Sequence, residues 1–98
     1  MNIQAMMKQA QAMQKDMMKI KSEVDNTEFT AESSFVKVTV KGTKEVVKVE
    51  INHDGNLESD DIEMLQDMIM IAINEANKKV DVMLEKKMGK FGNIPGLF

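Results

Sequence analysis

The chain contains no cysteine, arginine, tryptophan or tyrosine, and it has only one histidine. The absence of cysteine excludes disulfides and thiolate metal sites. A single histidine is too few for a site built on imidazole ligands, so we expect neither a metal nor a cofactor. Without arginine, the chain lacks the planar guanidinium fork that reads guanine edges or carboxylates through two parallel hydrogen bonds.

Large core side chains are also scarce. The 98 residues include four phenylalanines, while eleven methionines supply flexible side chains that fill irregular gaps. One domain is the limit at this length. Because a small chain with an adaptable core usually gains stability from disulfides, a metal or oligomerisation, and the first two are excluded, we expect a homodimer.

Long apolar runs are absent too. No run approaches the roughly 18 residues that a membrane-spanning helix needs. The first twenty residues lack the basic head and purely apolar run of a signal peptide. We therefore expect a cytoplasmic protein without a membrane association.

The segment from Asp60 to Met88 predicts one long amphipathic helix, with an acidic start and a lysine-rich end that both suit the helix dipole. Asp60 or Ser59 is the expected cap, with Glu63 completing a capping box. Six consecutive apolar residues at 68–73 leave the helix without a polar side over nearly two turns. This helix needs cover from more than one direction, which predicts a dimer interface. The expected interface residues are Met68, Ile69, Ile71, Ala72 and Ile73.

Residues 3–24 predict a second helix, because their apolar positions alternate between spacings of three and four, as in a coiled-coil seam. These positions are Ile3, Met6, Ala10, Met13, Met17, Ile20 and Val24. At about 1.5 Å per residue the helix would be roughly 33 Å long, which is more than packing in such a small domain requires.

Three strands are expected between the helices, at about 28–33, 35–41 and 45–52. The second strand shows the clearest period of two, with Val36, Val38 and Val40 alternating with polar residues. The third is expected to place Val47, Val49 and Ile51 on one face. Residues 42–44 fit a three-residue hairpin loop.

The predicted fold class is therefore α+β, in the order α-β-β-β-α, with a three-stranded antiparallel meander flanked by two long helices. Residues 1–89 form the single expected domain, because Gly89 ends the last helix. Residues 90–98 form a Gly/Pro-containing tail that we expect to be flexible. The sequence leaves open whether its apolar residues dock. They are Phe91, Ile94, Leu97 and Phe98.

Charge is unevenly distributed along the chain. The net charge is −3, but residues 1–22 and 78–98 each carry a balance of +3, whereas residues 53–77 carry −7. Antiparallel packing would bring the start of the first helix near the end of the last one, forming a lysine-rich tip. Lysines outside an apolar stripe also fit an ordinary solvated face, so charge alone leaves both interpretations open. The candidate DNA-binding residues are Lys8, Lys15, Lys78, Lys79, Lys86, Lys87 and Lys90.

Several segments, taken in order, resemble the YbaB/EbfC nucleoid-associated proteins of bacteria. They are the Met/Gln-rich stretch 6–14, the strand and turn 35–42, the strand 47–51, the helical segments 61–69 and 72–76, and the Gly/Pro tail 92–96. The resemblance implies a cytoplasmic homodimer with tweezer-like paired helices that binds double-stranded DNA in the nucleoid. It implies no enzymatic activity, and it supplies no residue-by-residue motif for DNA contact.

Other functions find less support in the sequence. No Gly-rich phosphate loop or Ser/His/Asp set is visible, so we expect no catalysis and no small-molecule substrate. His53 and Asp54 lie near Glu50 and Glu58 in the sequence, but a polar turn explains them more simply than a metal site. The alternative to DNA binding is a chaperone- or adaptor-like clamp for proteins. Our leading hypothesis is contact with the DNA backbone through lysines at the helix tips.

Overall fold

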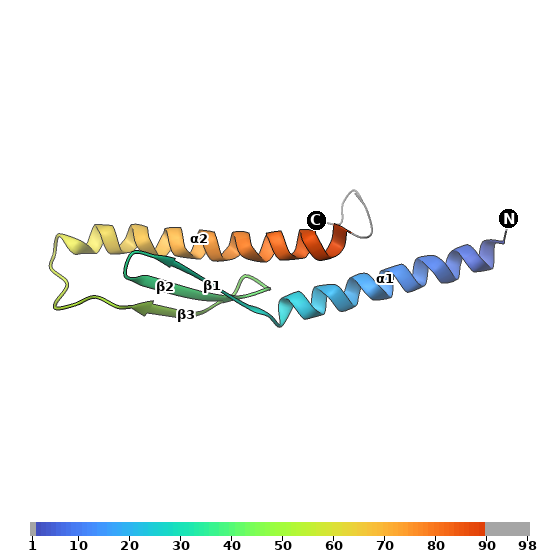
Figure 1. Cartoon of the computed structure of the whole chain (residues 1–98), viewed down its shortest axis with the longest axis horizontal. Coiled ribbons are helices and arrows are strands. Elements are labelled where there is room, and N and C mark those ends of the chain that lie inside the picture. Colours follow the sequence, from blue (N-terminus) through green and yellow to red (C-terminus); the bar gives the residue numbers. More distant parts are fainter. Residues whose placement is uncertain (1, 90–98) are drawn as a thin grey trace.

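The chain folds as a helix, three strands and a second helix. A computed structural model describes residues 2–89, so the predicted flexible tail at 90–98 lies outside the described residues. The elements are α1 (Ile3–Asp25), β1 (Glu28–Ser33), β2 (Val36–Lys41), β3 (Val46–Ile51) and α2 (Asp61–Met88) (Figure 1). The predicted element order is confirmed, and every boundary lies within one residue of the expected one.

The sheet is an antiparallel meander in the order β1-β2-β3. Ala31 of β1 and Val49 of β3 both pair with Val38 of β2, so their side chains share one face. The register between β2 and β3 shifts at Thr39 and Val40, so that Val46 pairs with Val40. A β-bulge thus skips one residue of β3, and Val46 is the residue opposite Val40.

Helix α2 crosses the sheet mainly over β1 and β2, and the core lies between them. Its residues Met68, Ala72, Ala76 and Val80 recur at spacing four and are all buried. The two alanines are completely buried, which lets the helix backbone approach the valines of β2 closely. Strand β3 lies beyond this cover, and all but one of its side chains are exposed.

Among residues 2–89, helix α1 packs against the other elements only through its last turns, where Ile20 and Val24 are buried. The rest of α1 projects beyond the end of α2 (Figure 1). The molecule consequently measures 71 × 21 × 15 Å, and its radius of gyration is 19.4 Å, against about 13 Å for a compact chain of 100 residues.

The predicted meeting of the two basic chain ends is wrong. The end of α2 lies beside the last turns of α1, where Lys87 Nζ is 3.8 Å from a carboxylate oxygen of Glu23. The start of α1 lies far from this point (Figure 1). The reason is that α2 begins at the far end of the sheet and uses much of its length to cross it, whereas α1 lies beyond the near end of the sheet and only its last residues reach it.

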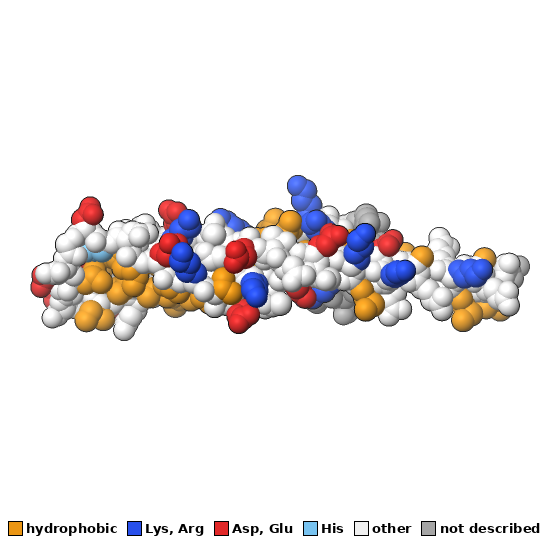
Figure 2. Space-filling view, turned by 90° about the horizontal axis from the view of Figure 1, so that it is seen from below, with side chains coloured by type: hydrophobic (Ala, Val, Ile, Leu, Met, Phe, Trp, Pro, Cys, Tyr) orange, Lys and Arg blue, Asp and Glu red, His pale blue; other side chains and the backbone are white. Residues whose placement is uncertain are grey.

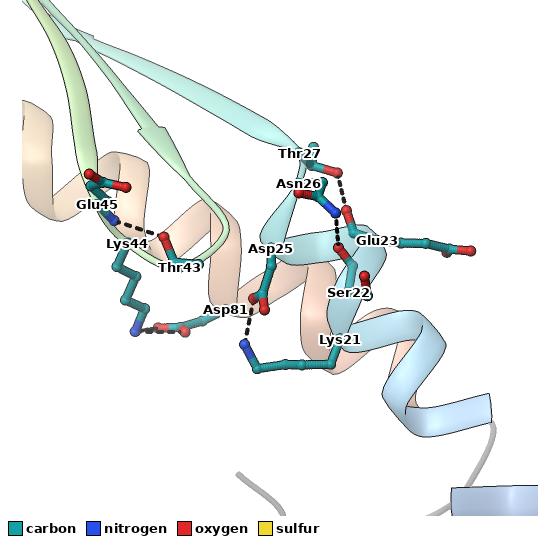
Figure 3. Close-up of polar contacts among 10 residues, drawn as sticks. All are labelled: Lys21, Ser22, Glu23, Asp25, Asn26, Thr27, Thr43, Lys44, Glu45 and Asp81. Atoms are coloured by element: carbon teal, nitrogen blue, oxygen red, sulfur yellow. Dashed lines mark hydrogen bonds and ion pairs between the residues drawn. The ribbon is translucent and has the colours of Figure 1, made fainter. Parts of the chain in front are cut away.

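Side chains close both ends of α1. Asn2 Oδ1 accepts hydrogen bonds from the backbone N–H groups of Gln4 and Ala5. At the other end, Asn26 Nδ2 and Thr27 Oγ1 donate to carbonyls of the last turn (Figure 3). These bonds satisfy groups that the end of a helix would otherwise leave unpaired.

The start of α2 differs from the expected capping box. Asp60 occupies the N-cap position, but its side chain makes no capping hydrogen bond. Instead, Asp61 Oδ2 accepts a hydrogen bond of 2.8 Å from the backbone N–H of Glu58.

The hairpin loop between β2 and β3 packs against the junction of α1 and β1. Gly42 N–H donates to the carbonyl oxygen of Thr27 at 2.9 Å. Lys44 adopts a left-handed backbone conformation, with φ of 73°, and its Nζ lies 2.9 Å from a carboxylate oxygen of Asp81 on α2 (Figure 3). The loop therefore joins the first helix to the last one.

Candidate nucleic-acid interface

Four lysines of α2 border an open groove between this helix and β1, which we call the lysine groove. Lys79, Val82, Met83 and Lys86 follow the spacing i, i+3, i+4, i+7, which places them on one side of the helix. The lysine groove is lined by Phe29, Glu75, Lys78, Lys79, Val82, Met83, Lys86 and Lys87. Its floor is apolar and its rim is mostly basic.

Three of these lysines have a partner within the molecule. Lys79 Nζ donates to the backbone carbonyl of Thr30 on β1, Lys78 lies 3.4 Å from Glu75 Oε1, and Lys87 pairs with Glu23. Lys86 forms no ion pair within residues 2–89. Exposed ion pairs contribute little to stability, so Lys78 and Lys87 can exchange their carboxylate partners for a phosphate at small cost.

The predicted lysines occupy separate places in the structure. Lys78, Lys79, Lys86 and Lys87 come together at the lysine groove, while Lys8 and Lys15 lie exposed on the projecting part of α1. Lys90 lies outside the described residues. Sequence reasoning missed Phe29, which lines the groove from β1. The sequence contains little indication that Phe29 lines a groove, because a phenylalanine on a strand usually belongs to the hydrophobic core.

Acidic side chains accompany the lysines along much of the molecule. Figure 2 shows basic and acidic groups interspersed over the middle of one face. The acidic start of α2 lies at the far end of the sheet, away from the lysine groove (Figure 1). This face therefore presents local basic sites instead of one broad positive field, and its attraction to a polyanion acts at short range.

Residues 2–89 offer neither a metal site nor a membrane span. No group of histidine and carboxylate side chains in this part of the chain could hold a metal ion. The His53 ring packs edge-on against Phe35 with 4.7 Å between ring centroids. None of the helices in the described part is long and apolar enough to span a bilayer.

The residues expected at a dimer interface separate into two groups. Met68 and Ala72 are buried in the protomer's own core against the sheet. Ile69 and Ile73 are half-buried at the margin of that core, and Ile71 is exposed. Only the last three residues are therefore available to a partner in this fold.

The fold resembles that of a solved structure, an uncharacterized protein from Helicobacter pylori. The TM-score is 0.75, and the match covers 95% of this chain and 99% of that one at 22% sequence identity. This similarity shows that the arrangement of two long helices around a three-stranded antiparallel sheet occurs in another protein.

Sequence comparison gives the family. A nucleoid-associated protein of Pelotomaculum thermopropionicum is 47% identical, with 99% of this chain and 96% of the relative covered. A nucleoid-associated protein of Alkaliphilus metalliredigens is 45% identical, with 99% and 89% covered. The model of the YbaB/EbfC DNA-binding family, whose members are not enzymes, matches residues 1–94. This chain therefore belongs to the YbaB/EbfC DNA-binding family.

Proposed function

We propose that this protein is a nucleoid-associated homodimer that binds duplex DNA through phosphate contacts from the lysine groove and from the projecting part of α1. The observation that carries the proposal is the gathering of Lys78, Lys79, Lys86 and Lys87 beside β1. Lys78 and Lys86 are eight residues apart on α2, a rise of about 12 Å. Separate phosphates of one duplex can therefore be contacted from the same helix.

Lysine without arginine favours contact with the backbone over reading of base edges. An ammonium group binds phosphate as a point charge, whereas guanine recognition typically uses a two-pronged donor. Phe29 is half-buried at the floor of the groove, so it offers no free platform for stacking single-stranded bases. The expected binding is thus tolerant of sequence and sensitive to salt.

The test of DNA binding is fluorescence anisotropy with a labelled duplex, titrated from low to physiological salt. Each phosphate contact contributes about 0.9 to the slope of log affinity against log salt. We expect a slope of several units and similar affinities for two duplexes of unrelated sequence. Absence of binding at low salt would contradict the proposal, and the protein-clamp alternative would then take the lead.

The uncovered side of β3 is the surface that we propose for dimerisation. Val49 and Ile51 keep exposed fractions of 42% and 44% although they share a face with the core valines of β2. Glu75 and Lys79 lie on the flank of α2 that borders β1. Ile69 and Ile73 lie on the other flank of the helix, which therefore faces β3. Figure 2 shows hydrophobic side chains gathered at the left end of the view, where β3 and the start of α2 lie. A contiguous patch of exposed apolar side chains often marks a protein–protein interface.

Changing Val49 to lysine is expected to convert the dimer into a monomer, because a charge would be buried without a partner at the interface. The measurement is molar mass by light scattering after gel filtration. Val82→Lys is the matched control, because Val82 is apolar and 63% exposed but lies on the opposite flank of α2. A monomeric wild-type protein, or a dimeric V49K variant, would show that the interface lies elsewhere.

A further inference from the structure

The apolar face of α1 continues well beyond the part that the core covers. Ile20 and Val24 are buried, and the same helical face carries Ile3, Met6, Ala10, Met13 and Met17, which we call the α1 stripe. Exposure rises steadily along it, from half-buried Met17 to 40% at Met13, 53% at Met6 and 68% at Ile3. The stripe thus loses its cover in one direction, toward the start of the helix.

Within residues 2–89, the cover of α1 ends where α2 ends. Met88, the last residue of α2, is buried in the same cluster as Ile20 and Val24. Because α2 runs antiparallel to α1, its direction points from the covered part of α1 toward the uncovered part (Figure 1). The chain that follows Gly89 therefore begins at the covered end of the α1 stripe.

The nine residues that follow have a suitable length and composition. Residues 90–98 contain one charged residue, Lys90, and four large apolar ones, which are Phe91, Ile94, Leu97 and Phe98. Nine extended residues span at most about 30 Å. The distance along α1 from Met17 to Ile3 is about 21 Å at the helical rise. The segment is long enough to follow the stripe to its end.

Charge makes the α1 helix of a second copy a poor alternative occupant. The first 22 residues carry a balance of +3, so pairing two such helices would oppose lysines of the same sign. A segment of the same chain adds a single positive charge and is present at the high effective concentration of an intramolecular ligand. We propose that residues 90–98 dock along the α1 stripe of their own chain and extend the core along the projecting helix.

Absence of cysteine makes this docking directly testable. A chain with Met6→Cys and Leu97→Cys is treated with a short bis-maleimide, and cross-linking within one chain is followed by mass spectrometry of peptides. Gln4→Cys with Leu97→Cys is the matched control, because Gln4 lies two residues away on the opposite side of α1. We expect cross-links at Met6→Cys in at least fivefold excess over the control. Equal yields from both variants would overturn the proposal.

A mixture of the two single-cysteine chains, Met6→Cys and Leu97→Cys, distinguishes docking of the tail on its own chain from docking on a partner chain. Cross-links that form mainly between chains would overturn docking within one chain.

A second measurement uses a chain that stops after Gly89. In this shortened chain trypsin should cleave after Lys8 and Lys15 about tenfold faster than in the full chain, because the cleavage rate follows the population of opened helix. An unchanged cleavage rate would also count against the proposal. Both tests are independent of DNA binding.

Discussion

Replacing Gly42 by alanine is expected to destabilise the fold severely. A β-carbon at this position would lie 1.8 Å from the carbonyl oxygen of Val24 and 2.3 Å from its carbonyl carbon. Both atoms belong to the backbone at the end of α1, so no side-chain rotation relieves the clash. The hairpin loop would have to retreat, which breaks the Gly42 N–H bond to Thr27 and opens the packing around Val24.

Overpacking of this kind costs about 3 kcal/mol, and a domain of this size loses roughly 4–8 °C in melting temperature per kcal/mol. We therefore expect Gly42→Ala to lower the melting temperature by about 15 °C, measured by circular dichroism at 222 nm.

Two other glycines provide graded controls for this experiment. A β-carbon added at Gly89 would meet no atom of the described residues 2–89 within 4 Å, and this residue has an ordinary helical φ of −57°. Alanine there should therefore change the melting temperature little. Gly55 also has free space, but its φ is 82°, and a left-handed conformation costs a residue with a side chain about 1–2 kcal/mol. The melting temperature of the Gly55→Ala variant should therefore lie between those of the Gly42→Ala and Gly89→Ala variants. A Gly42→Ala variant as stable as Gly89→Ala would show that the loop can move away freely.

Neutralising the lysine groove is expected to abolish most DNA binding. A variant with Lys78, Lys79, Lys86 and Lys87 changed to glutamine removes four positive charges from one side of α2. Loss of four phosphate contacts would reduce the salt slope by about 3.6 per protomer and the affinity at low salt on the order of 100-fold. Glutamine keeps most of the length of the side chain and adds no repulsive charge, so the fold should persist.

The control for this variant is a matched set of four lysines in the β2–β3 hairpin. They are Lys37, Lys41, Lys44 and Lys48. Changing them to glutamine alters the net charge equally and also breaks two ion pairs, from Lys44 to Asp81 and from Lys48 to Glu50. If net charge alone governed binding, both variants would lose affinity equally. That outcome, or undiminished binding by the groove variant, would refute the lysine groove as the DNA site.

The element order could be predicted because its signals are local. The alternation of Val36, Val38 and Val40 with polar residues is a property of six neighbouring residues, and it remains visible whatever packs against the strand. The spacing of apolar residues along α1 likewise marks one face of a helix before any partner is known. Membership of the YbaB/EbfC family was also evident from the order of several such segments, and the sequence comparisons confirm it.

The choice among equally apolar residues could not be predicted in the same way. In the run 68–73 all six residues are apolar, so periodicity cannot indicate which of them face inward. The sheet decides this, because α2 crosses β1 and β2 with Met68 and Ala72 against the valines of β2 and with Ile71 turned outward. The bulge that places Val46 opposite Val40 is a similar case, since both neighbouring residues are valine.

The largest difference between the sequence-based prediction and the structure concerns the positions of the lysines. The sequence by itself determined that both ends of the chain are basic and that two long helices carry these charges. Only the tertiary structure decided that α2 ends beside the last turns of α1, so that the two sets of lysines lie apart and Phe29 of β1 completes the groove. The physical reason is that burial of apolar surface between segments distant in sequence sets how the helices are placed. Local sequence patterns indicate how much apolar surface each helix carries, but they do not indicate which other segment covers it.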